Sequence, residues 1–391
     1  VPKKQNEFSL FQDRIGDQLL KLCPTRSCRE QRILWIPTKE EYCFSMTNKK
    51  IITILEPSDE YTHEPDVASN YNESMYFNTF DIDKEIGGWF RLGNRVNEGY
   101  AEMSICVYLP NGQVGFMFDR PQISDNRSMQ AGGLSIDVIK PFETLKLSYS
   151  GKVCLLKDPK QMANPRQAFK ENPIVDCNIE LDWVGMSPMF GGKPVYEDGS
   201  EIETNAEGSF AKAHYEQHGK MAGVITIGKE EIDIHGMGLR DKSWGARYWQ
   251  SISWYRWLPM VFSPDFAMML SIISPDSSGE KVRRSGMVLE GDKYKLIKDC
   301  RIETSWDESD YQTGIRCWAK TEDGNEYEIE GEVISLIPLR NRREAPNGEK
   351  LMTRITEAMT KYRCNGEVGI GMSEYLDQIK DGQPTGRDFS G

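Results

Sequence analysis

The stretch that decides the fold of this chain is IHGMGLRDKSWGARYWQSISWYRW, residues 234–257. It places Arg240, Asp241, Lys242 and Arg247 among four tryptophans and three glycines. Glycine permits positive φ and close backbone approach, so this composition suits a turn or bulge between strands. Charged groups beside indole rings are costly to bury unless they are paired and hydrogen bonded. The stretch therefore predicts either a structural ion pair under an aromatic cover or reactive groups in an apolar pocket.

Strands are predicted on both sides of this stretch. Alternating apolar residues over 101–109 precede Asn111-Gly112, a strong signal for a tight hairpin. Further strand-like segments follow at short intervals, at 267–274, 282–289, 295–303, 314–321, 327–337 and 352–362. This rhythm is typical of antiparallel barrels and sandwiches. No glycine-rich nucleotide-binding motif follows a predicted strand, so nucleotide-binding folds are not supported.

The length of 391 residues suggests about two domains. Residues 1–30 are expected to form an N-terminal extension with a short helix, because they carry a capping-box pattern and apolar residues at helical spacing. We predict a first β domain at 31–190 and a connection at 191–212, rich in glycine and acidic residues. A second β domain with the RDKSWG motif is expected at 213–391.

The composition is that of a soluble globular protein, with 38% hydrophobic and 28% charged residues. A net charge of −12 argues against nucleic acid as a partner. No apolar run is long enough for a transmembrane segment, and no signal peptide is visible. Nine scattered cysteines predict reduced, buried thiols and a cytoplasmic location. Cys23 and Cys28 lack the second pair that a zinc site needs, so no metal is predicted.

Several segments resemble proteins related to hydroxyneurosporene synthase, the carotenoid 1,2-hydratase. They are ESMYFNTFDIDKEIGGWFRLGNRVNEGYAE (73–102), HYEQHGKMAGVITIGKEEIDIHGMGLRDKSWGARYW (214–249) and NGEVGIGMSEYLDQ (365–378). The resemblance implies an all-β fold of two tandem lipocalin-like antiparallel barrels, with a hydrophobic pocket in or between them. It also implies hydration of an isoprenoid double bond, or cyclisation of a polyene, without a cofactor. The chain departs from these relatives at Lys242, where they more often carry histidine.

Hydration of an isolated C=C bond needs a dry proton donor, a group that stabilises a cation and a placed water. Burial raises the pKa of a carboxylic acid, and aromatic faces stabilise cations by about 0.5–2 kcal/mol each. Asp241 is therefore the predicted acid. If Arg240 paired with it, Asp241 would instead be a base or an anchor. Because consecutive residues of a strand point to opposite faces, we expect one of the two to aim inward and the other to join the domains.

The candidate site draws on both halves of the chain. The predicted catalytic residues are Asp241, Arg240 and Glu73, and the predicted substrate-binding residues are Trp244, Tyr248, Trp249, Tyr76, Asn78, Trp89 and His214. Glu73 could form an acid–base pair with Asp241, or it could pair with Arg91 or Arg95 on the next strand. His214, Tyr215 and Glu216 are alternatively interpreted as capping or domain-interface residues.

These patterns leave three functions open. The first is a cofactor-independent hydratase, lyase, isomerase or cyclase that acts on a hydrophobic isoprenoid or polyene by acid catalysis. The second is a non-catalytic carrier of a lipid or terpenoid in a barrel. The third is a structural or partner-binding protein. The sequence also leaves open whether the protein forms a homodimer.

Overall fold

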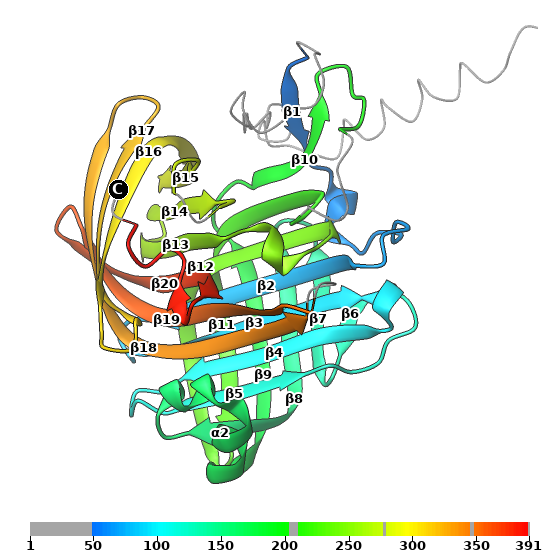
Figure 1. Cartoon of the computed structure of the whole chain (residues 1–391), viewed down its shortest axis with the longest axis vertical. Coiled ribbons are helices and arrows are strands. Elements are labelled where there is room, and N and C mark those ends of the chain that lie inside the picture. Colours follow the sequence, from blue (N-terminus) through cyan, green and yellow to red (C-terminus); the bar gives the residue numbers. More distant parts are fainter. Residues whose placement is uncertain (1–48, 203–209, 277–278, 345–347, 390–391) are drawn as a thin grey trace, which may run out of the picture.

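The alternating segments form two large antiparallel sheets in the computed structural model, which describes residues 49–202, 210–276, 279–344 and 348–389 (Figure 1). The first sheet contains β1 (Ile51–Ile54), β2 (Tyr71–Asp81), β3 (Ile86–Arg95), β4 (Tyr100–Tyr108), β5 (Val114–Asp119), β6 (Met129–Ala131), β7 (Leu134–Lys140), β8 (Thr144–Leu156), β9 (Ile174–Gly185), β10 (Phe190–Tyr196), β11 (Ala213–Ile227) and β12 (Glu230–Ala246). The second contains β13 (Trp254–Ser263), β14 (Phe266–Ser274), β15 (Arg283–Glu290), β16 (Lys293–Trp306), β17 (Gln312–Thr321), β18 (Glu326–Glu344), β19 (Lys350–Cys364), β20 (Glu367–Lys380) and β21 (Gln383–Pro384).

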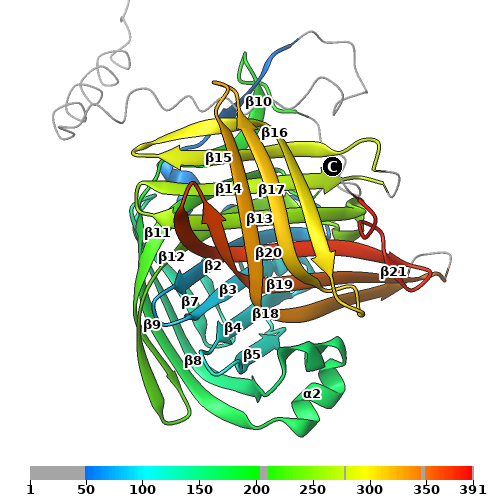
Figure 2. The ribbon, with the colours of Figure 1, turned by 90° about the vertical axis from the view of Figure 1, so that its left-hand side faces the viewer.

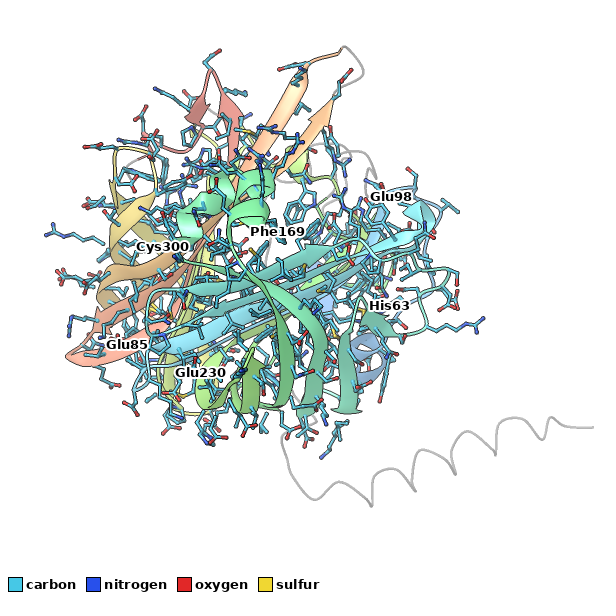
Figure 3. All side chains as sticks on the ribbon, turned by 90° about the horizontal axis from the view of Figure 1, so that it is seen from below. His63, Glu85, Glu98, Phe169, Glu230 and Cys300 are labelled. Carbon is cyan, nitrogen blue, oxygen red and sulfur yellow. The ribbon has the colours of Figure 1, made fainter. Side chains whose placement is uncertain are left out.

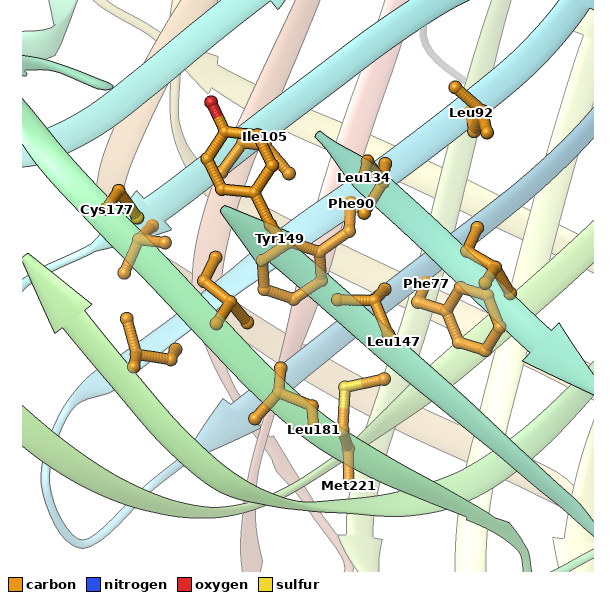
Figure 4. Packing of buried hydrophobic residues seen from close by; sticks show 14 of the residues in the cluster. Phe77, Phe90, Leu92, Ile105, Leu134, Leu147, Tyr149, Cys177, Leu181 and Met221 are labelled. Carbon is orange, nitrogen blue, oxygen red and sulfur yellow. The ribbon is translucent and has the colours of Figure 1, made fainter. Parts of the chain in front are cut away.

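The first sheet closes into a barrel because β9 hydrogen bonds to both β8 and β11. The closed path runs β11-β12-β2-β3-β4-β5-β8-β9 and back to β11. Apolar residues on the inward positions of these strands fill the interior, among them Phe77, Phe90, Leu147 and Met221 (Figure 4). Alternation therefore sends every second residue of each strand to the outer face of this barrel.

The second sheet closes in the same way because β13 pairs with both β14 and β20. Its closed path is β13-β14-β15-β16-β17-β18-β19-β20. Leu258, Met260 and Leu270 lie in its buried apolar cluster. A lipocalin-like all-β fold is thus confirmed.

The two barrels pack with their outer faces together, and Figure 2 shows β13 and β20 lying alongside β12 and β2. A third buried apolar cluster contains residues from both barrels, including Trp89, Trp257 and Met372. The short helices η4 (Pro159–Ala163) and α2 (Pro165–Glu171) lie at one edge of this contact, where Phe169 joins the same cluster (Figure 3). The junction between the barrels is therefore a buried interface rather than a flexible linker.

The division between the barrels corrects the expected domain boundary. We expected the second domain to begin at residue 213, but β11 and β12 hydrogen bond to β9 and β2 and complete the first barrel. The second barrel begins only at Trp254. Part of the expected connection is also a strand, since β10 pairs with β1 and β11. The RDKSWG motif consequently belongs to the first barrel.

Other expectations from the sequence are confirmed. Asn111-Gly112 forms the β4–β5 hairpin, with Gly112 at a φ of +81°. The six cysteines within the described ranges are free and buried, namely Cys106, Cys154, Cys177, Cys300, Cys317 and Cys364. The predicted N-terminal helix, Cys23 and Cys28 lie outside the described residues. None of the helices in the described ranges is long and apolar enough to span a membrane.

Candidate functional site

Strand β12 divides the RDKSWG motif between two environments. Arg240 and Lys242 point into the first barrel and are fully buried, whereas Asp241 and Ser243 lie on its outer face, toward the second barrel. This arrangement follows from the two-residue period of a regular strand. The expectation that Arg240 and Asp241 point to opposite faces is therefore confirmed, with Arg240 as the inward member, while a role of Asp241 in joining the barrels stays a prediction.

Arg240 holds one end of the first barrel closed. Its guanidinium donates to both carboxylate oxygens of Glu60 at 2.7 and 2.8 Å, and its Nε donates to Gln217 at 3.0 Å. Glu60 ends the short helix η2 (Pro57–Glu60) and is fully buried. Burial opposes the charge of Glu60, but Arg240 holds the pKa of that carboxyl below its usual value. Arg240 is thus saturated by a structural ion pair and does not pair with Asp241.

Glu73 lies in a second buried ion pair beside the first. Its carboxylate is 2.8 Å from the Lys242 ammonium and 2.7 Å from His63 Nδ1. Burial alone would raise the pKa of Glu73, but the bonds from His63 and Lys242 lower it to about 2. The expectation that Glu73 pairs with Arg91 or Arg95 is wrong, because Lys242 reaches it across the adjacent strand. Trp244 also points inward and stacks on His63, with ring centroids 4.2 Å apart.

The outer face of β11 and β12 carries three ionisable groups that face the second barrel. His214 Nε2 lies 3.8 Å from Glu216 Oε1 and 3.9 Å from Asp241 Oδ2. Trp257, from β13 of the second barrel, donates its indole N–H to Glu216 Oε1 at 2.8 Å. The other oxygen of Glu216 is buried and has no hydrogen-bond partner among the residues that the structure describes. Burial raises the pKa of Glu216 to about 7, with the nearby Asp241 carboxylate adding to the effect.

The second barrel contributes two further carboxyl groups to this junction. Glu357 on β19 and Glu374 on β20 are cross-strand partners, and Glu374 accepts a hydrogen bond from Tyr255. Burial and the neighbouring carboxyl raise the pKa of Glu357 well above its usual value. Burial raises the pKa of Glu374 to about 7. We refer to His214, Glu216, Asp241, Glu357 and Glu374 as the inter-barrel acid cluster.

Aromatic side chains surround the inter-barrel acid cluster. Tyr76 lies edge-on to Trp257, at 5.7 Å between ring centroids, and its hydroxyl is buried. Trp89 stacks near Tyr76 at 6.2 Å. Asn78 accepts from the Leu239 backbone N–H at 2.9 Å. These three substrate-binding candidates therefore do lie on the face that carries Asp241.

The remaining candidates lie where the chain passes from one barrel to the other. Trp249 and Tyr248 are half-buried, in the connection between β12 and β13. The Arg247 guanidinium lies over the Trp249 ring, 5.2 Å from its centroid. Trp244, in contrast, does not reach the acid cluster, because it points into the first barrel.

Solvent reaches part of the cluster. The side chains of His214 and Asp241 are 45% and 24% exposed, whereas Glu216 beside them is 2% exposed. Burial opposes the charge of His214, but the carboxylates of Asp241 and Glu216 raise the pKa of its imidazole. The His214 imidazole thus lies between a buried carboxyl that can hold a proton, Glu216, and a partly solvent-exposed carboxyl, Asp241. Such a set can deliver a proton to an apolar molecule and take one from water.

The sequence of the chain places it in a family. Residues 56–379 match the family described as "Domain of unknown function (DUF7064)". The chain belongs to this family. A comparison with curated proteins finds no match.

Solved structures similar to this DUF7064 protein share its fold at low sequence identity. A candidate ATTH from Nitrosomonas europaea is 11% identical, with a TM-score of 0.50 over 83% of this chain and 96% of that chain. CghA with Sch210972 is 12% identical, with a TM-score of 0.47 over 79% and 89% of the two chains. Kievitone hydratase from Nectria haematococca is 10% identical, with a TM-score of 0.46 over 84% and 93%. The likeness to the Nitrosomonas protein agrees with the two-barrel fold described above.

Several residues of the cluster escaped the sequence analysis of this DUF7064 protein. Glu357 lies in a segment that reads as an ordinary alternating strand, and Glu374 lies in the segment 365–378 that carries the family resemblance, but neither was singled out as a site residue. Glu216 was considered, with a capping or interface role weighed against catalysis, but it was not among the predicted catalytic residues. Its cross-strand register with Asp241 is the signal that identifies it, and that register requires knowing that β11 and β12 pair.

Proposed function

We propose that this protein is an acid–base catalyst of the hydratase, lyase or isomerase type. We further propose that it acts on an unsaturated, hydrophobic small molecule bound between the two barrels. The observation that carries the proposal is Glu216. It is a buried carboxyl with a pKa near 7, one oxygen fixed by Trp257 and the other free to meet a substrate. A group with this pKa is available as a proton donor at neutral pH.

In the proposed hydration, Glu216 transfers its proton to one carbon of the double bond, so that an O–H bond breaks and a C–H bond forms. The cation at the adjacent carbon is stabilised by the ring faces of Trp257 and Tyr76, by about 0.5–2 kcal/mol each. A water on the side of Asp241 then forms the C–O bond and gives its proton to that carboxylate. His214, nearly equidistant from the two carboxyls, returns the proton to Glu216.

The same groups would catalyse dehydration in reverse, or a double-bond shift or ring closure without water. Asp241 keeps a place in this mechanism, as a base rather than as the acid expected from the sequence. Arg240 and Glu73 have none, because both are saturated by buried ion pairs at the end of the first barrel. Membership of the carotenoid hydratase group stays a prediction from the resemblance.

The test compares Glu216→Gln with the wild-type protein on a panel of unsaturated terpenoids and polyenes, assayed by mass spectrometry for gain or loss of water and for isomerisation. Glutamine keeps an oxygen that accepts from Trp257 but has no acidic proton. We expect a loss of turnover of about 10²–10⁴-fold, the usual contribution of a general acid. Glu231→Gln, an exposed position on the same barrel, is the matched control. Equal turnover in wild type and Glu216→Gln would remove Glu216 from the chemistry. Binding without turnover by the wild type would favour the carrier.

A further inference from the structure

Arg247 is a buried cation that forms no ion pair with a carboxylate of the described residues. Its side chain lies between the rings of Phe210 and Trp249, 4.5 and 5.2 Å from their centroids, and it is 8% exposed. The hydrogen bond of its guanidinium within the described ranges goes to Ser243 Oγ at 2.7 Å, and no ion pair joins it there. Burial and the nearby Arg91 guanidinium lower the pKa of Arg247 to about 10, against the opposing effect of the Asp241 carboxylate. The folded structure therefore disfavours the charged form of the Arg247 side chain.

Arg91 is a second cation beside Arg247, and both lie near the Trp249 ring. Its guanidinium also lies over the Trp249 ring, 5.8 Å from the centroid. Nη1 is 3.3 Å from Glu102, a carboxylate shared with Arg120, while Nη2 is buried and has no hydrogen-bond partner in the described part of the chain. A Cβ at Gly93 would lie 2.7 Å from Nη2, so the glycine leaves room for the guanidinium against the sheet.

The attractions that hold Arg247 are too weak to account for its burial. A cation over an aromatic face is attracted far more weakly than a cation paired with a carboxylate. Removing a guanidinium from water is unfavourable unless a counter-charge is present, and a second guanidinium nearby makes it more so. The Asp241 carboxylate acts on the charge of Arg247 from nearby, but no ion pair joins the two among the described residues, and the Nη2 of Arg91 is buried there without a hydrogen-bond partner. A bound anion would complete the site.

We propose that Arg247 and Arg91 bind an oxyanion carried by the substrate, such as a carboxylate. This inference rests on the proposed function and names the class of its substrate: an acid with an apolar or aromatic body. Ser243, which accepts from Arg247, is the cross-strand partner of His214 and lies two residues from Asp241. The oxyanion would thus anchor one end of the molecule while its unsaturated part lies beside Glu216 and Trp257.

The test uses two fluorescent probes that differ only in an anionic group, anilinonaphthalene sulfonate and phenylnaphthylamine. Wild-type protein is titrated with each near neutral pH. The variants are Arg247→Gln and Arg91→Gln, with Arg316→Gln, an exposed arginine of the second barrel, as the control for loss of one positive charge. We expect the sulfonate to bind about tenfold or more tightly than the neutral probe, a ratio typical of a charge-assisted hydrogen bond. Each site variant should lose that preference and keep its affinity for the neutral probe within about twofold.

Three outcomes would overturn the proposal: wild type that shows no preference for the sulfonate, a preference that survives both site variants, or an equal loss of both probes in variants that remain folded. Arg91→Gln keeps the test decisive if Arg247→Gln does not fold. Glu216→Gln separates this proposal from the proposed function, because it should abolish turnover and leave the preference for the sulfonate intact. Loss of the preference in Glu216→Gln would contradict a separate anion subsite.

Discussion

Replacing Glu216 by glutamine should stabilise the protein at alkaline pH. The folded-state pKa of Glu216 is raised from 4.5 to about 7. A raised carboxyl pKa favours folding only while the group is protonated, so the wild type loses stability as pH rises from about 4.5 to about 7. The difference of about 2.5 units corresponds to about 3 kcal/mol above pH 7. Glutamine is neutral at every pH and avoids this cost.

The assay is urea unfolding of wild type, Glu216→Gln and the Glu231→Gln control, at about pH 5 and about pH 8. We expect wild type and Glu216→Gln to differ by no more than about 1 kcal/mol at the lower pH, where most of the Glu216 carboxyl is protonated. At the higher pH the variant should be more stable by about 3 kcal/mol, while the control follows the wild type. A difference that does not change with pH would refute the raised pKa. A variant less stable than wild type at about pH 8 would show that the charged carboxylate is held by partners instead.

Two further predictions concern the closed end of the first barrel. Arg240→Met should destabilise the protein by about 3–5 kcal/mol, because it leaves Glu60 charged and buried. The double variant Arg240→Met/Glu60→Met should recover most of that loss in thermal unfolding. A double variant no more stable than the single one would contradict the pairing. Glu73 has its pKa lowered to about 2, so its contribution, about 3 kcal/mol, is present above pH 4.5 and is lost as pH falls toward 2. Glu73→Gln should therefore flatten the fall in urea midpoint between about pH 5 and pH 3, and an unchanged slope would show that other groups control acid unfolding.

Local patterns in the sequence were enough to predict the fold class. Alternation and turn residues predicted segments such as 101–109 and 352–362, because inward and outward positions of a half-buried strand differ in polarity. Local patterns do not predict which strands pair in a barrel, because the backbone groups at one strand edge can in principle hydrogen bond to any other strand. The β12–β2 pairing joins residues 237–246 to 71–80, far apart along the chain. The expected boundary at residue 213 differs from the structure for this reason. It assumed that strands late in the sequence belong to the second barrel, whereas β11 and β12 pair with strands of the first.

The candidate site shows the same division between local and long-range information. The split of Arg240 from Asp241 followed from strand period alone, and the structure confirms it. The ion pairs that saturate Arg240 and Lys242 come from Glu60 and Glu73, on segments whose position only the closed barrel defines. The place of Glu374 in the site could be predicted still less, because it follows from the packing of one barrel on the other.

The two faces of β12, the strand that carries the RDKSWG motif, differ in how well their charged groups are paired. Inward, Arg240 and Lys242 are held by ionised carboxylates, which fixes β12 relative to the end of the barrel. Outward, Asp241 lies 3.9 Å from His214, and Ser243 accepts from Arg247. Glu216, the other carboxyl beside His214, has one buried oxygen without a hydrogen-bond partner among the described residues. A reactive face with unpaired buried groups destabilises its own strand, because each such group costs about 1–3 kcal/mol. In the proposed mechanism, the saturated face offsets this cost without taking part in the chemistry. Substitutions on the inward face should therefore lower stability first, and substitutions on the outward face should lower turnover while raising stability.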